Sequence, residues 1–266
     1  MAKAETIRRG KLGKLELRLV SSESKFFGLA DGKILLEGDD ADHVWQRLHS
    51  EAGKSDPKYF GYSGARARFL YWFAGGFQST EYLTLERSYK LQARDKLESI
   101  SVEQAASGSG YGPAIWRVFQ TNLLSPFEKM RVREALHSQE ADEFVRGAAR
   151  FALGEGKLAL RQMESALKPH LAAKWTVATY LPFLWLPQHH MYLKPEATKD
   201  FAARVGHRFA NEYEPALVME VYDSLLDLAK ETARELAELE PRDRIDVQSF
   251  IWIVGDYREG REDRHL

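Results

Sequence analysis

The stretch that decides the fold runs from Lys174 to Pro195 and reads KWTVATYLPFLWLPQHHMYLKP. It is the most apolar and aromatic part of the chain. A membrane span needs about 20 uninterrupted apolar residues, and Pro182, Pro187 and two adjacent histidines break this stretch. In water its apolar surface has to be covered by other elements. We therefore expect the helices on either side to close over it, with Trp185 in the core.

The composition is that of a globular protein. The chain has 266 residues, 44% of them hydrophobic, which is enough for one large domain or two modest ones. The 38 basic and 39 acidic residues nearly cancel, so nucleic-acid binding cannot be argued from net charge, only from local patches. The absence of cysteine excludes disulfides, thiolate metal sites and a cysteine nucleophile.

Residues 14–37 predict a small antiparallel meander of three strands. Apolar and charged residues alternate in its first strand, and Asp31-Gly32 is typical of a two-residue hairpin turn. A helix that Asp39 or Asp40 can cap follows directly. We expect these elements to form a βββα unit over residues 1–54.

Helical signals dominate the rest of the chain. Ser125-Pro126-Phe127-Glu128 combines a capping box with a proline in the first turn, which predicts a helix from Pro126. Apolar spacing and breaker residues predict further helices after Ser79-Thr80 and at 113–124, 139–153, 157–167, 195–206 and 214–238.

The segment 246–254 is open between a strand and a buried helix. Its apolar residues recur at the i, i+3, i+4 and i+7 positions of a helix, namely Val247, Phe250, Ile251 and Val254. We favour a helix that Asp246 caps and Gly255 ends.

Together these signals predict an α+β fold that is mostly α-helical. A small N-terminal antiparallel βββα unit (1–54) precedes a larger helical body (55–257), which is built around the 174–195 aromatic stretch. The charged residues 258–266 are expected to form a disordered tail.

Two pairs of phrases carry a resemblance. The first is Gly61-Tyr-Ser-Gly-Ala-Arg-Ala-Arg-Phe-Leu70 with Glu86-Arg-Ser-Tyr-Lys90, and the second is His190-Met-Tyr-Leu-Lys-Pro195 with Asp243-Arg-Ile-Asp-Val-Gln-Ser-Phe-Ile-Trp252. Both resemble uncharacterised bacterial proteins. The second pair is also similar to the C-terminal parts of proteins found near restriction or other defence genes. The resemblance implies a bacterial cytoplasmic context and transfers no catalytic residue.

The N-terminal sequence points to the same compartment. MAKAETIRRG has the basic start of a signal peptide but lacks the apolar run that should follow it. We expect a cytoplasmic protein without a membrane partner.

A basic and aromatic surface is the main candidate site. Lys58-Tyr-Phe-Gly-Tyr-Ser-Gly-Ala-Arg-Ala-Arg68 interleaves rings with cations, a mixture that suits phosphates and unstacked bases of a single strand. The apolar run at 69–73 equally fits a core helix. The candidate nucleic-acid-binding residues are Arg66, Arg68, Arg87, Lys90 and Arg94.

A metal site is the alternative. His189, His190 and Asp246 could supply ligands to the ion of a metal-dependent hydrolase or nuclease. Adjacent histidines diverge on either a strand or a helix, and the chain has no His-Glu-x-x-His motif. Histidines hydrogen-bonded at the edge of the aromatic core are the simpler interpretation.

We therefore expect a non-enzymatic bacterial interaction or accessory protein without a cofactor. It would bind a protein partner of unknown identity, and single-stranded nucleic acid is a second candidate partner. The metal-dependent hydrolase or nuclease is kept as the alternative function.

Overall fold

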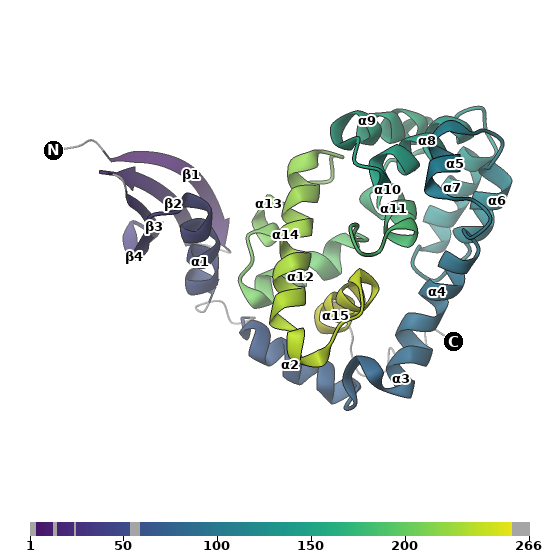
Figure 1. Cartoon of the computed structure of the whole chain (residues 1–266). Helices are drawn as coiled ribbons and strands as arrows, with labels where there is room; N and C mark the ends of the chain where they lie inside the picture. The colour runs from purple at the N-terminus through teal and green to yellow at the C-terminus, as the bar shows by residue number, and fades with distance from the viewer. Residues whose placement is uncertain (1–3, 13–14, 24, 54–58, 257–266) are drawn as a thin grey trace.

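The computed structural model describes residues 4–12, 15–23, 25–53 and 59–256. A four-stranded antiparallel sheet at the N-terminus is followed by a body built from helices (Figure 1), so the α+β fold expected from the sequence is confirmed. The boundary expected between residues 54 and 55 and the tail 258–266 lie outside the described residues.

The sheet has one strand more than the sequence predicts. Its strands are β1 (Glu5–Leu12), β2 (Leu15–Ser22), β3 (Lys25–Ala30) and β4 (Lys33–Gly38), each paired with the next. The prediction missed β1 because this strand has few apolar residues and is stabilised by its pairing with β2. The predicted hairpin turn is confirmed: Asp31 and Gly32 have φ of 46° and 79°, as a type I′ turn requires.

Helix α1 (Ala41–Gly53) covers one face of this sheet. Asp40 Oδ1 accepts a hydrogen bond from His43 N at 2.7 Å, so the predicted cap is confirmed. Glycines let the helix approach closely, since a Cβ at Gly10 would lie 3.2 Å from the Trp45 ring. We call the side of the sheet that faces α1 the inner face and the opposite side the outer face.

The body consists of short helices and single turns. The helices are α2 (Gly61–Trp72), α3 (Thr80–Tyr82), α4 (Ser88–Asp95), α5 (Val102–Ser107), α6 (Gly112–Val118), α7 (Pro126–Leu136), α8 (Ala141–Ala152), α9 (Gly156–Leu167), α10 (Trp175–Ala178), α11 (Tyr180–Trp185), α12 (Pro195–Val205), α13 (Phe209–Glu212), α14 (Met219–Glu235) and α15 (Arg244–Asp256). The turns are η1 (Gly76–Gln78), the π-helical η2 (Leu83–Arg87), η3 (Lys168–His170) and η4 (Ala237–Leu239). In the described part of the chain, no helix has both the length and the apolar character of a membrane span.

Most of the predicted helices are present. The capping box of α7 is confirmed, because Ser125 Oγ accepts from Glu128 N at 3.3 Å while Glu128 Oε2 accepts from Ser125 N at 2.9 Å. The helices predicted at 113–124, 139–153, 157–167, 195–206 and 214–238 correspond to α6, α8, α9, α12 and α14.

The ambiguous segment 246–254 is helical, but both of its predicted ends are wrong. Asp243 rather than Asp246 caps α15, since Asp243 Oδ1 accepts from Ile245 N at 2.9 Å. Gly255 lies inside the helix, where a Cβ would collide with the backbone oxygen of Ala197 in α12. Close packing of two helices, rather than helix termination, explains this glycine.

The aromatic stretch lies in the core as expected. Trp175, Tyr180 and Tyr192 are fully buried, and the Tyr180 ring stacks on Phe119 with 4.3 Å between ring centroids. Trp185 packs against the core but is only half-buried, so its expected full burial is wrong; its Nε1 donates to Ile100 O at 3.0 Å.

The sheet unit and the helical body have separate hydrophobic clusters that share no residue. Polar groups join them: Gln46 Nε2 of α1 donates to Asp227 Oδ2 of α14 at 3.0 Å, and Arg208 Nη2 donates to the same oxygen at 2.9 Å. His49 is fully buried near Arg208, and neither of its ring nitrogens has a hydrogen-bond partner. We call this polar contact the seam.

Candidate functional site

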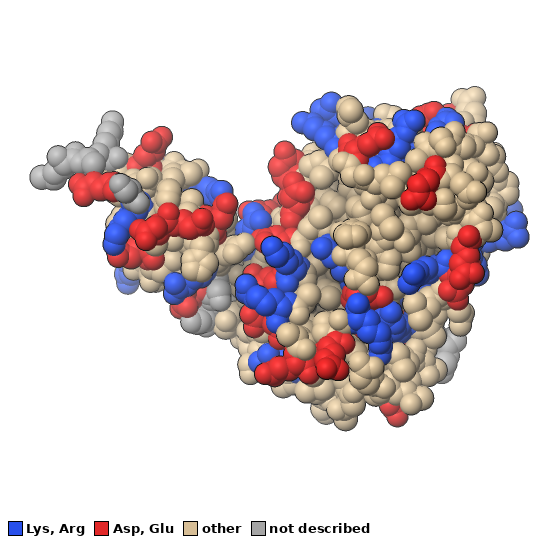
Figure 2. All heavy atoms as spheres, in the orientation of Figure 1, with Lys and Arg blue, Asp and Glu red and all other residues tan. Residues whose placement is uncertain are grey.

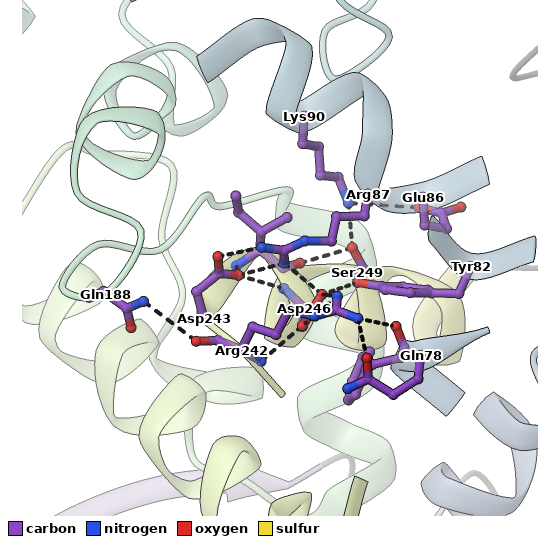
Figure 3. Close-up of polar contacts among 12 residues, drawn as sticks. Gln78, Tyr82, Glu86, Arg87, Lys90, Gln188, Arg242, Asp243, Asp246 and Ser249 are labelled. Carbon is purple, nitrogen blue, oxygen red and sulfur yellow. Dashed lines mark hydrogen bonds and ion pairs between the residues drawn. The ribbon is translucent and has the colours of Figure 1, made fainter. Parts of the chain in front are cut away.

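Two of the five predicted nucleic-acid residues are buried. Arg87 Nη1 and Nη2 donate to the carboxylate of Asp243 at 2.8 and 2.7 Å, and Nη1 also donates to Asp246 Oδ1 at 2.7 Å (Figure 3). Lys90 is fully buried, and its Nζ donates to Ser249 Oγ at 2.6 Å. Binding to a phosphate needs both side chains in solvent, and the structure buries Arg87 and Lys90 instead.

A local change of helix type explains why both side chains are buried. The turn η2 between α3 and α4 is a π-helix, in which Ser88 N bonds the oxygen of Leu83 five residues earlier. This turn holds one residue more than an α-helical turn, which rotates the following side chains by about 100° relative to the α-helical pattern. Arg87 and Lys90 consequently face α15.

The cluster around Asp246 is closed to further ligands. Tyr82 Oη donates to Asp246 Oδ1 at 2.6 Å, and Arg242 N donates to Oδ2 at 2.9 Å (Figure 3). Burial, together with the Asp246 charge, raises the pKa of Tyr82 well above its ordinary value, so Tyr82 stays a neutral donor. This buried network joins the segment α3–α4 to α15.

Lys90 and Ser249 have the arrangement of a serine-lysine pair in hydrolases. Burial lowers the pKa of Lys90 to about 8, which would suit a general base. Both side chains are fully buried, however, and Ser249 Oγ donates to Ile245 O at 2.9 Å. Since no substrate atom can reach the hydroxyl in this arrangement, we assign the pair a structural role.

The structure does not bring the remaining predicted cations together. Arg66 Nη1 donates to Glu235 O at 2.9 Å and lines a cleft between α1, α2 and α14. Arg68 is half-buried on α2, and Arg94 is exposed on α4, in a different hollow beside Trp185. On the face shown in Figure 2, basic and acidic side chains intermingle over the body. Binding of nucleic acid by these three residues stays a prediction.

The alternative metal ligands are also separated. His190 is buried, with Nδ1 2.9 Å from Tyr222 Oη and Nε2 2.9 Å from Ala152 O, whereas His189 is exposed. Asp246 belongs to the closed network of α15. Within the described ranges, no three histidine or carboxylate side chains are placed to hold a metal ion.

Three large apolar side chains on two neighbouring segments are exposed, which the sequence did not predict. Phe127 and Met130, one turn apart on α7, are 75% and 52% exposed, and Leu171 after η3 is 66% exposed. Arg131 Nη1 of α7 donates to Leu171 O at 3.1 Å, which holds the two segments together. We call Phe127, Met130 and Leu171 the α7 patch.

The backbone of Leu171 is strained. Its φ and ψ are 53° and 27°, a left-handed conformation that costs a residue with a Cβ roughly 1–2 kcal/mol. Hydrogen bonds from Leu171 N to Lys168 O and from Ala172 N to Leu167 O, each 3.1 Å, maintain it. A strained backbone thus presents an apolar side chain to water.

No known family model, curated protein or solved structure matches the chain. The resemblance to uncharacterised bacterial proteins stays a prediction.

Proposed function

We propose that the protein is a non-enzymatic accessory protein of the bacterial cytoplasm that binds a partner protein through the α7 patch. The observation that carries this proposal is Leu171, which is exposed and held in a left-handed conformation beside Phe127 and Met130. Strain tends to be kept where it serves function, and grouped exposed apolar residues mark interaction surfaces.

Charge around the α7 patch indicates the chemistry of the partner. Lys168 and Lys174, three residues to either side of Leu171, are exposed and form no ion pair with any described residue. Glu134 is an exposed carboxylate on the same face of α7, two turns beyond Phe127. The surface suits a segment with apolar anchors and carboxylates beside them, because such a segment would meet both the patch and the lysines.

The buried polar groups support a non-enzymatic role. The carboxylate of Asp246 already accepts from Tyr82 and Arg87, and the hydroxyl of Ser249 is inaccessible. Both side chains are thus engaged in holding helices together.

The proposal is tested by photo-crosslinking followed by binding measurements. A photo-reactive amino acid in place of Met130 should capture a partner, which is then purified and titrated against the parent and the double variant Phe127→Ser, Leu171→Gly. We expect the double variant to bind roughly tenfold more weakly or worse, since apolar anchors dominate such interfaces. Leu158→Ser is the matched control, because Leu158 is 73% exposed outside the patch.

Leu171→Gly also separates binding from folding. Glycine adopts positive φ without strain, so this single variant should unfold at the same temperature as the parent or higher while binding the partner more weakly. Undiminished binding by the double variant would overturn the proposal. So would crosslinking at position 130 that yields only copies of this chain, or no product at all.

A further inference from the structure

The outer face of the sheet is not covered by any described element. Gly10 and Gly28 contact α1 on the inner face, so their neighbours Arg9, Phe27 and Leu29 point to the outer face. On this side Ile34 of β4 is 62% exposed. A sheet with one open face is common, but such a face is normally polar.

The charges on the outer face are unevenly distributed. At one end Lys11 lies opposite Glu16, and at the other Lys25 Nζ forms an ion pair with Glu37 at 2.9 Å.

Between these balanced ends, the register places Arg9 directly opposite Arg18. Neither arginine forms an ion pair within the described residues. Like charges opposite one another destabilise a sheet, so two uncompensated cations are held together at a cost to stability.

Apolar side chains lie beside these cations. In the row of Arg9 and Arg18, Leu29 and Ile34 follow on β3 and β4, and the neighbouring row contains Phe27. The Arg18 side chain reaches along the face, since its Nη2 would lie 3.7 Å from a Cβ at Gly32 in the β3–β4 turn. The face therefore combines a flat apolar strip, one ring and two unpaired arginines.

We propose that this outer face binds single-stranded nucleic acid, with phosphates at Arg9 and Arg18 and unstacked bases against Phe27, Leu29 and Ile34. Open sheets that bind RNA use the same combination of cations and flat apolar or aromatic surface. A duplex would offer phosphates but hide its base faces, which would leave the apolar strip in water. A run of acidic residues alone would meet the arginines but would leave the apolar strip in water.

This site is independent of the α7 patch. Figure 1 shows the sheet and α7 at opposite ends of the molecule. A protein partner and a nucleic-acid strand can therefore bind at the same time, which goes beyond the proposed function.

The test measures fluorescence anisotropy of labelled oligothymidylate and oligouridylate over a series of salt concentrations. The parent should bind at micromolar concentration in low salt. The variant Arg9→Gln, Arg18→Gln should bind roughly tenfold more weakly, and its salt slope should be lower by about 1.4, since each phosphate contact on a single strand contributes about 0.7. The control Arg133→Gln, Arg161→Gln removes the same charge from exposed positions on α7 and α9 of the body and should bind as the parent does.

Folding and ring stacking are tested separately. The Arg9→Gln, Arg18→Gln variant should melt no lower than the parent, because it removes a repulsive pair. Phe27→Leu keeps the apolar volume but removes the ring, so it should weaken binding roughly tenfold without changing the salt slope.

Several results would overturn the proposal. These are no binding by the parent in low salt, unchanged binding by the arginine variant, equal affinity for duplex DNA, or stronger binding of polyglutamate than of either oligonucleotide. The last result would assign the face to an acidic protein segment.

Discussion

His49 links the fold to pH. It is fully buried in the seam against Trp45, and both ring nitrogens lack hydrogen-bond partners. Burial, together with the nearby His207 and Arg208, lowers the pKa of His49 from 6.5 to about 3. The folded protein therefore keeps this imidazole neutral at pH values where the unfolded chain protonates it.

We expect the free energy of unfolding to fall as the pH drops from 6.5 towards 3, because only the unfolded state binds this proton. At pH 5 the contribution of His49 amounts to about 2 kcal/mol relative to neutral pH, at about 1.4 kcal/mol per pH unit. Urea unfolding at several pH values measures it. His49→Phe should reduce the dependence of the free energy of unfolding on pH. Burial also lowers the pKa of His190, so the contribution of His190 remains in both proteins. Equal slopes would contradict the burial of His49.

The roles of single residues could be predicted from the sequence only where they depend on residues nearby in the chain. Ser125 and Asp40 were identified as caps because a cap depends on residues within one helical turn. The burial of Arg87 and Lys90 depends on an inserted π-helical turn and on partners in α15, which no local pattern shows. The exposure of Phe127 is equally non-local, since an apolar residue on a helix ordinarily indicates the core.

Among the elements, α15 shows that a residue can have a structural role other than the one its sequence pattern indicates. Apolar spacing predicted this helix correctly, but Gly255 serves the contact with α12 rather than the helix end. The strand β1 was missed for a related reason, because it depends on β2 more than on its own residues.

Gly255→Ala should destabilise the protein by about 1–3 kcal/mol, because the added Cβ would collide with the backbone oxygen of Ala197. Helix propensity alone predicts the opposite sign, a gain of about 1 kcal/mol. Urea denaturation of the variant against the parent decides between them. Ser165→Ala, on the exposed face of α9, is the control and should stay within about 0.5 kcal/mol of the parent. A Gly255→Ala variant as stable as this control would mean that α12 and α15 are not in close contact.

For the whole molecule, the separate hydrophobic clusters and the polar seam predict unequal stability. A small unit with its own modest core and few apolar contacts to its neighbour opens at a lower free energy than a large one.

Hydrogen exchange of the native protein, followed by mass spectrometry, should therefore show faster exchange in β1–β4 and α1 than in α8, α14 and α15. The difference should persist in the Arg9→Gln, Arg18→Gln variant, whose change lies away from the seam. The contrary result is one common exchange rate for all these segments when exchange is limited by unfolding equilibria. The two units would then unfold together, and the seam would stabilise their contact as much as a shared hydrophobic core would.

The fold class and the organising stretch were predictable because composition and periodicity act over the whole chain. The candidate sites were not, since the α7 patch and the outer face are defined by which side chains other elements leave uncovered.

The closed network around Asp246 also constrains how the chain can fold during synthesis. The hydrogen bonds from Arg87 and Lys90 to α15 join residues 156 to 159 positions apart. Until residues 243–249 leave the ribosome, Arg87 lacks both of its carboxylate partners, and burying that unpaired charge would be strongly unfavourable. The strands of the sheet pair only with their sequence neighbours and form early. A nascent chain would thus display the arginines of the sheet while the body is still unable to close.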